Sequence, residues 1–304
     1  MITGLLLVDK PEGPTSHQIV AQARRVLGER KIGHAGTLDP MASGLLTLGV
    51  GGATRLLTFL TGLDKTYQAT IRLGRETTTD DRLGDAQGES ASPESLRRVT
   101  DDEILSALEN FVGDILQVPS SVSAIKTDGR RAYDRVRAGE EVVLDPRPVR
   151  IDSIVPHAIR RDAEGIDLDC TVDCSSGTYI RALARDLGRA LGIGGHLTAL
   201  RRTRVGPWQL DRALRPDDIA PDRLVSPVDM VREVMPVVEC DRATAVELGH
   251  GKPGAVGRVA PHLPDGSRCA VVHHGRLIAI LGTAEGRPRI LVGFPADPQE
   301  VTSD

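Results

Sequence analysis

The chain has 304 residues, a formal net charge of −4 and only seven aromatic side chains. This length can bury a sizeable core and is typical of two domains. No apolar run approaches ~20 residues, and no basic region followed by a long apolar stretch opens the chain, so we expect no membrane span, no signal peptide and a cytoplasmic location. The four cysteines include no C-x-x-C pair, which favours reduced thiols over a metal site or disulfide framework.

The first predicted elements surround one acidic side chain. Leu5 to Asp9 is predicted to be a strand, and Ser16 to Leu27 an amphipathic helix entered at a Thr-Ser cap. In GHAGTLDPMASG (33–44), the three glycines permit positive φ and close approach, and Pro40 favours an extended Asp39. This arrangement presents the Asp39 carboxylate to a ligand, although an Asp before Pro also supports ordinary turns.

The remaining chain mixes strands and helices without a βαβ period. Strands are predicted at 67–73, 149–156 and 166–174, and helices at 101–111 and 181–191. After Pro227 the pattern changes to short alternating strands with tight turns, within 269–282 and 287–295. We therefore expect a mixed α/β (α+β) catalytic domain, a small β domain and, over 297–304, a disordered tail.

Charge is unevenly distributed along the chain. Residues 1–75 hold nine basic and five acidic side chains, and residues 118–215 hold seventeen and thirteen. Residues 76–117 hold three and eleven, which we interpret as a solvated acidic insertion. The basic segments allow contact with RNA phosphates, whereas the scarcity of aromatic residues argues against a broad stacking platform for single strands.

Four blocks of sequence stand out between residues 5 and 208. They are LLLVDKPEGPTSHQIV (5–20), GHAGTLDP (33–40), GGATRLL with DKTYQATIRLG (51–57 and 64–74), and CSSGTYIRALARDLG followed by HLTALRRTRVGPW (174–188 and 196–208). In this order they resemble the motifs of the bacterial TruB-type pseudouridine synthases. The resemblance covers most of this stretch and is far more specific than any single motif.

The resemblance implies a fold and a division into domains. It implies a long, largely antiparallel sheet with a cleft across its middle, in a catalytic domain over residues 1–227. The residues 228–296, including VELGHGKPGAVG (246–257), resemble the small PUA-like β barrel that the family appends for contact with an RNA stem. This second match carries no diagnostic side chain.

The resemblance also implies a reaction, the isomerisation of a T-loop uridine of tRNA, position 55, to pseudouridine. Asp39 matches the family's indispensable aspartate, and Arg181 matches the arginine that pairs with it, since an ionised acid in a closed cleft needs a positive partner. Tyr67 matches the tyrosine that stacks on the flipped base, and it can also act as a base. Tyr179 matches a further pocket residue. The reaction needs no cofactor and no metal.

Contacts with the RNA are assigned by the same resemblance. His34 matches the histidine that fills the gap left in the RNA loop, and Leu200 and Lys65 match pocket and backbone contacts. Lys10 is expected to order the first turn rather than perform chemistry. Residues 125–143 resemble a thumb that closes on RNA, the alternative being a surface helical hairpin. The thumb's expected phosphate contacts are Lys126, Arg130 and Arg131.

Two other functions fit parts of the sequence. A tRNA-binding folding factor that remodels the tRNA elbow would use the same surface, and it would not need Asp39. A hydrolase with an aspartate nucleophile would need a second acid or base near Asp39, and none stands at motif spacing. Guide-RNA-dependent relatives share the motifs, but they work within multiprotein assemblies and carry longer basic extensions, which this acidic chain lacks. We therefore expect a monomer that acts directly on the T arm of tRNA.

Overall fold

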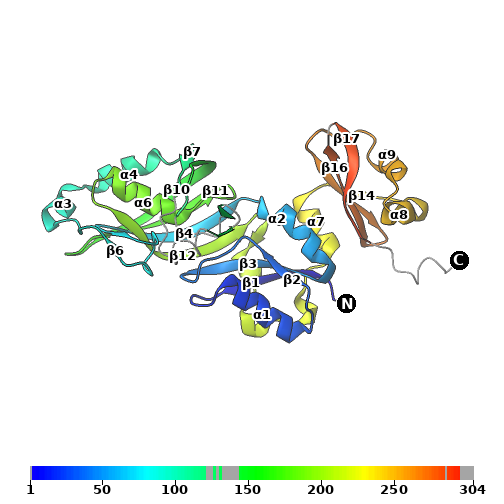
Figure 1. Cartoon of the computed structure of the whole chain (residues 1–304), viewed down its shortest axis with the longest axis horizontal. Helices are drawn as coiled ribbons and strands as arrows, with labels where there is room; N and C mark the ends of the chain where they lie inside the picture. Colours follow the sequence, from blue (N-terminus) through cyan, green and yellow to red (C-terminus); the bar gives the residue numbers. More distant parts are fainter. Residues whose placement is uncertain (1, 121–125, 128–129, 132–143, 285, 295–304) are drawn as a thin grey trace.

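The protein is described here by a computed structural model, in which residues 2–120, 126–127, 130–131, 144–284 and 286–294 are described. Within them, one long sheet runs through the larger part of the molecule, and a small four-stranded sheet forms a separate lobe (Figure 1). No helix in the described ranges is both long and apolar enough to cross a membrane.

The long sheet contains nine strands among the described residues, in the order β1-β3-β12-β4-β11-β10-β7, with β2 paired to β3 and β13 to β12. All of these pairs are antiparallel except β3 with β12. The strands are β1 (Gly4–Lys10), β2 (Ile32–Ala35), β3 (Ala42–Val50), β4 (Lys65–Leu73), β7 (Gly113–Gln117), β10 (Arg147–Arg161), β11 (Ile166–Cys174), β12 (Gly195–Val205) and β13 (Trp208–Gln209). The expected mixed, largely antiparallel sheet is therefore confirmed.

Helices pack against both faces of this sheet, over two hydrophobic cores. The α-helices of the larger part are α1 (Ser16–Leu27), α2 (Leu57–Thr61), α3 (Pro93–Arg98), α4 (Asp101–Glu109), α6 (Ile180–Ala190) and α7 (Pro227–Val234). Helix α1 begins at the predicted cap, where Thr15 and Gln18 form a capping box, and ends at Gly28 with φ 62°. Ile19 and Val20 of α1 and Leu183 and Leu187 of α6 enter the same core as β4 and β11.

Shorter elements connect these strands and helices. They are β5 (Glu76–Thr77), β6 (Ala86–Gln87), β8 (Lys126–Thr127), β9 (Arg130–Arg131) and the 3₁₀ helices η1 (Gly51–Leu56), η2 (Leu210–Arg212), η3 (Pro216–Asp218) and η4 (Pro221–Arg223). Strands β8 and β9 pair as an antiparallel hairpin within the expected thumb. The side chains of this hairpin, the rest of residues 125–143 and the expected tail at 297–304 lie outside the described residues.

The small lobe follows α7. Its elements are β14 (Val237–Glu239), α8 (Arg242–Gly249), η5 (Pro253–Ala255), α9 (Val256–Val259), β15 (Arg268–His273), β16 (Arg276–Ala284) and β17 (Arg287–Gly293). The predicted strands and the tight turn after His273 are present, but the described strands form an open sheet, β14-β15-β16-β17, and no closed barrel. Residues 246–257 contribute helix rather than strand, because Leu248 and Val256 bury one helical face against the sheet.

The lobe packs against the rest of the molecule through apolar side chains. Phe59 and Leu60 of α2 and Val231 of α7 share a buried cluster with Val272 and Ile280 of the small sheet. Figure 1 shows α2 and α7 between the two sheets. A continuous apolar contact of this kind favours a defined docking of the lobe over free movement on a linker.

Candidate active site

The loop between β2 and β3 carries Asp39, and glycine is required at two points, in this loop and in the first residues of β3. Gly36 has φ 76°, and a Cβ there would lie 3.3 Å from Nη1 of Arg202. Gly44 has φ 101°, and its Cβ would lie 2.2 Å from the carbonyl oxygen of Arg202. These two glycines confirm the predicted close approach, but Gly33 lies in β2, where no positive φ is found.

A cleft of about 340 Å³ opens beside this loop. It lies where β4 and β12 pass the start of α6, so residues distant in sequence meet in it. The cleft is lined by six of the residues singled out from the sequence, namely Asp39, Lys65, Tyr67, Tyr179, Arg181 and Leu200. Among its described lining residues Asp39 is the only carboxylate.

Arg181 joins the predicted acid to the protein interior. Its Nε lies 3.0 Å from Oδ2 of Asp39, and its Nη1 donates to the carbonyl of Thr79 at 2.9 Å. The Arg181 side chain is 5% exposed, whereas that of Asp39 is 37% exposed. The guanidinium is therefore held from behind while the carboxylate keeps an edge open to the cleft.

A second acid, Asp81, was missed by the sequence analysis. Its Oδ2 lies 3.4 Å from Nη1 of Arg181, and its side chain is 6% exposed. Its Oδ1 accepts from the hydroxyl of Thr79 at 2.7 Å and from the backbone N–H of Leu83 at 2.9 Å. The interpretation of residues 76–117 as a solvated acidic insertion is wrong at this point, because Asp80 and Asp81 are buried against arginines of α6.

Charges around Asp39 act in opposite directions on its acidity. Enclosure in the cleft raises the pKa of Asp39 above its ordinary value, and Asp81 raises it further, while Arg181, Lys10 and Arg202 lower it. Burial also lowers the pKa of Lys10 to about 8. Lys10 donates to the carbonyls of Pro11 and Pro14, so its expected part in ordering the first turn is confirmed.

Tyr67 and Lys65 enter the cleft from alternate positions of β4. Tyr67 is 7% exposed, and it lines the cleft together with Arg202. Burial raises the pKa of Tyr67 above its ordinary value, which opposes its ionisation and hence its use as a base. Lys65 donates to the carbonyls of Thr61 and Leu63, and burial lowers its pKa to about 8.

Tyr179 stands immediately before α6 and is fixed through its backbone. The side-chain amide of Gln117 donates to the Tyr179 carbonyl at 3.1 Å and accepts from the Tyr179 N–H at 2.8 Å. Gln117, at the end of β7, is 2% exposed. This double contact fixes the start of α6, and the sequence analysis missed Gln117 because a lone Gln at a strand end carries no motif.

The remaining predicted RNA contacts are less central. Leu200 of β12 is 8% exposed and forms part of the cleft wall. His34 lies in β2, outside the lining of the cleft, and its ring meets that of His17 edge to face at 5.2 Å. The side chains of Lys126, Arg130 and Arg131 lie outside the described residues.

Two family models match the chain. The model described as TruB family pseudouridylate synthase (N terminal domain) matches residues 24–180, and the one described as tRNA pseudouridylate synthase B C-terminal domain matches residues 181–231. The chain belongs to the TruB family of pseudouridylate synthases.

Relatives of this TruB-family chain match it over nearly its whole length. The tRNA pseudouridine synthase B of Arthrobacter sp. (strain FB24) is 50% identical and aligns with 98% of this chain and 99% of its own. That of Corynebacterium diphtheriae is 47% identical over 97% of each. Among solved structures, a Cbf5-Nop10-Gar1 complex has a TM-score of 0.69 at 26% identity and matches 96% of this chain and 85% of that chain. An H/ACA RNP bound to a substrate RNA containing 2′-deoxyuridine has a TM-score of 0.68 at 25% identity, and the match covers 98% of this chain and 86% of that chain.

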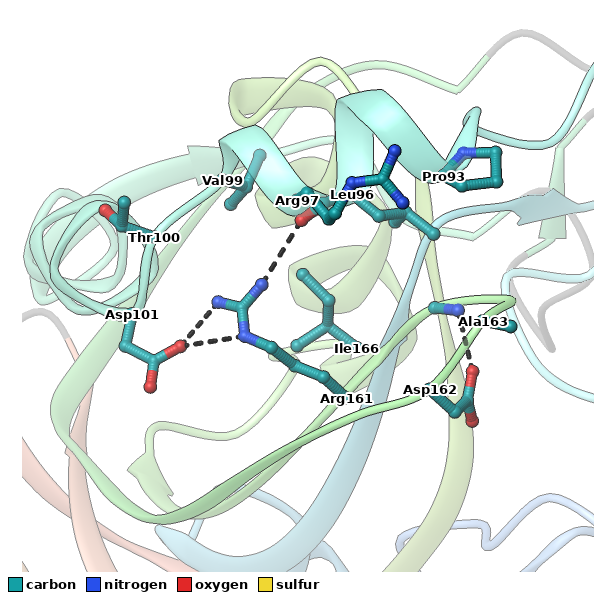
Figure 2. A pocket seen from close by; sticks show the side chains of 11 residues that line it. Pro93, Leu96, Arg97, Val99, Thr100, Asp101, Arg161, Asp162, Ala163 and Ile166 are labelled. Carbon is teal, nitrogen blue, oxygen red and sulfur yellow. Dashed lines mark hydrogen bonds and ion pairs between the residues drawn. The ribbon is translucent and has the colours of Figure 1, made fainter.

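A second cavity in this TruB-family chain, of about 440 Å³, is lined by α3, the start of α4 and the turn between β10 and β11 (Figure 2). Arg161 pairs with Asp101 across it and donates to the Leu96 carbonyl at 3.2 Å. Its other walls include the apolar side chains of Val99 and Ile166. Its one internal ion pair is satisfied locally and it contains none of the motif residues, so the smaller cleft at Asp39 is the candidate active site.

Proposed function

We infer that this TruB-family chain isomerises a uridine of tRNA to pseudouridine. The observation that carries this function is the Asp39 carboxylate, open to the cleft on one edge and held by Arg181 at 3.0 Å on the other. The reaction breaks the bond from N1 to C1′, turns the uracil and joins C5 to C1′. It is redox neutral and consumes no co-substrate, so the residues of the cleft suffice for it.

Asp39 serves in its ionised form. The carboxylate either attacks C1′ or C6 of the nucleotide or stabilises a cationic sugar while a neighbouring proton is removed. Both routes need a negatively charged Asp39. Enclosure in the cleft disfavours this charge by raising the pKa of Asp39, whereas Arg181, Lys10 and Arg202 favour it by lowering that pKa. Arg181 also fixes the direction of the carboxylate through its own bond to the Thr79 carbonyl.

The target uridine has to leave its stack to reach Asp39, at a cost of a few kcal/mol. We propose that Tyr67 offsets part of this cost by stacking on the flipped base, with Leu200 and Tyr179 completing the pocket. The raised pKa of Tyr67 supports this role over that of a base in the free protein. Aromatic rings suit it because they provide a large, rigid apolar surface.

The substrate within tRNA is the T-loop uridine at position 55. The printed name of the relatives, tRNA pseudouridine synthase B, supports tRNA as the substrate, and the basic segments at 1–75 and 118–215 support contact with its phosphates. We assign residues 125–143 to a thumb and His34 to the space left in the RNA loop. The chain acts as a monomer in the cytoplasm.

The two lobes divide this work. Residues 1–227 form the catalytic domain, and residues 228–296 form a PUA-like module that contacts the RNA stem. Exposed Arg268, Arg287 and Arg289 on β15 and β17 support this second assignment, since they place positive charge on one small sheet. Arg268 also lies 5.2 Å from the ring centroid of Phe59, next to the junction of the lobes.

Release of tritium from tRNA labelled at uracil C5 tests the function. Formation of the new bond at C5 expels that hydrogen to water, so we expect release with wild type and none with Asp39→Asn. A tRNA-folding factor without catalysis would release none in either case. Wild-type protein that releases no tritium from any tRNA would remove the enzymatic function.

A further inference from the structure

A second arginine of α6 stands one turn beyond Arg181. Arg185 follows it by four residues, so both side chains project from the same face of the helix. Arg185 is 7% exposed. Its Nη1 lies 3.1 Å from Oδ2 of Asp80, and its Nη2 donates to the Val118 carbonyl at 2.7 Å. Its Nε lies 2.8 Å from Oδ1 of Asp186.

Asp80 holds a backbone conformation that few side chains adopt. Its φ is 58°, and His274 is the one other non-glycine residue with positive φ in the described part of the chain. Asp tolerates this left-handed region better than most residues, yet the conformation persists only where the surroundings impose it. The bond from Arg185 to the Asp80 carboxylate is one such restraint.

The turn at Asp80 positions the Thr79 carbonyl, which accepts a hydrogen bond from Arg181 of the proposed active site. The φ torsion of Asp80 orients the peptide unit that joins it to Thr79, and so it directs the Thr79 carbonyl. That carbonyl accepts from Nη1 of Arg181 at 2.9 Å and from the hydroxyl of Ser120 at 3.2 Å. The next residue, Asp81, supplies the second acceptor of Arg181. Arg185 therefore restrains, through Asp80, two of the groups that hold Arg181.

The same pair also controls charge. Asp80 is 8% exposed, and without Arg185 its carboxylate would draw on Arg181, the cation that Asp39 needs. The ionisable groups that face Asp80 come from α6 and from its own loop, and those that face Asp39 come from four segments. Arg185, Arg181 and Arg189 act on Asp80, while Asp186 pairs with Arg185 and Asp81 pairs with Arg181. Arg181, Asp81, Lys10 and Arg202 act on Asp39.

We propose that Arg185 and Asp80 are positioning residues for the reaction, which hold Arg181 in the geometry that orients and ionises Asp39. This inference rests on the proposed roles of Asp39 and Arg181. Neither Arg185 nor Asp80 lines the cleft, so both act through Arg181 and not on the nucleotide.

The test compares Arg185→Gln, Asp80→Asn and their combination with a matched control on the same helix. The control is Arg189→Gln, because Arg189 forms a two-point ion pair with Glu76, at 2.9 and 2.8 Å, on a more exposed part of α6. Single-turnover tritium release at saturating protein gives the chemical rate at each pH. tRNA affinity and thermal unfolding are measured in parallel.

Arg185→Gln is expected to slow single-turnover release on the order of 10- to 100-fold, because a small misplacement of a catalytic group is costly. Its tRNA affinity should stay at the wild-type value. The acidic limb of its pH profile should move to higher pH, since Asp80 then competes for Arg181. Asp80→Asn should move that limb to lower pH, and the combined variant should return it toward wild type. Arg189→Gln should leave the rate close to that of wild type and move the limb less than either substitution of the Arg185–Asp80 pair, because Arg189 is the weakest of the charges that act on Asp80.

Opposite shifts in the two single variants separate positioning from a general loss of structure. Three results would overturn the inference. They are an unchanged rate in Arg185→Gln, a slower rate in Arg185→Gln with its acidic limb at the wild-type pH, and acidic limbs of Arg185→Gln and Asp80→Asn that move in the same direction. Equal loss in Arg189→Gln would do the same. If Arg185→Gln does not fold, Arg185→Lys replaces it, and Asp80→Asn still has to give the shift to lower pH. Turnover by Asp39→Asn would instead overturn the proposed site.

Discussion

The arginine–aspartate pairs on the two faces of β4 differ in their exposure to solvent. Lys65, Tyr67 and Arg181 line the cleft. Arg181 pairs with Asp81, which is not part of this lining, and these two side chains are 5% and 6% exposed. Thr66, between Lys65 and Tyr67 in sequence, points to the opposite face of the strand. There Thr66 bonds to Asp173, which pairs with Arg204 at 3.1 Å, and these two charged side chains are 36% and 26% exposed.

The difference in exposure decides what each pair can do. On the face of Thr66, water screens the charges, and such pairs contribute little to stability. In the cleft, screening is weak, so the same chemical groups set the acidity and direction of Asp39. We therefore expect substitutions in the cleft to affect the chemical step and those on the other face to affect stability slightly.

The largest effect is expected for Asp39→Asn. The amide keeps the shape of the side chain but can neither attack the nucleotide nor stabilise a cationic sugar by its charge. Tritium release should be abolished, while tRNA affinity stays close to that of wild type. Residual release near the wild-type rate would remove Asp39 from the mechanism, and a parallel loss of affinity would assign it to binding.

Arg181→Lys should come next in severity. An ammonium cannot reach Asp39, Asp81 and the Thr79 carbonyl at once in the planar geometry of guanidinium. We expect the single-turnover rate to fall on the order of 100-fold or more, with the protein still folded. A fully active Arg181→Lys, measured beside Asp39→Asn, would show that the pair does not matter for chemistry.

Asp81→Asn separates orientation from charge. Asp81 raises the pKa of Asp39, so its neutralisation should lower that pKa. Because Asp39 works ionised, activity is lost as pH falls through its pKa, and the acidic limb should move to lower pH. The plateau rate should still fall, since Arg181 loses one of its acceptors. A plateau loss with the limb moved to higher pH would contradict this account.

The sequence predicted one side of this network and missed the other. Asp39, Tyr67, Tyr179 and Arg181 lie in short sequence blocks that resemble family motifs, so they could be singled out from neighbouring residues alone. Asp81 lies in an acidic stretch, where burial depends on which helix packs against it. Local composition favours a solvated loop there, and only the long-range contact with α6 reverses that preference.

In the fold, too, features set by local sequence were predicted and features set by long-range packing were not. Helix α1 was predictable to its ends because its cap and its final glycine are local signals. The stretch 246–257 was assigned to a barrel, yet it contains parts of α8 and α9. Its four glycines and one proline interrupt any period, and Leu248 and Val256 become helical by packing on the small sheet.

The smallest effect is expected for Arg204→Gln on the face of β4 opposite the cleft. Partial burial raises the pKa of Asp173, but hydrogen bonds from Thr66 and Arg204 outweigh this and hold that pKa below its ordinary value. A carboxyl with a lowered pKa adds stability above its unfolded pKa, and this stability is lost as pH falls through its folded pKa. Urea unfolding near neutral pH should therefore show Arg204→Gln less stable by about 1 kcal/mol or less. The difference should shrink in high salt and below about pH 4, and tritium release should match wild type. A rate loss comparable to that of Asp81→Asn would mean that both faces of β4 control the chemistry, and the distinction between them would fail.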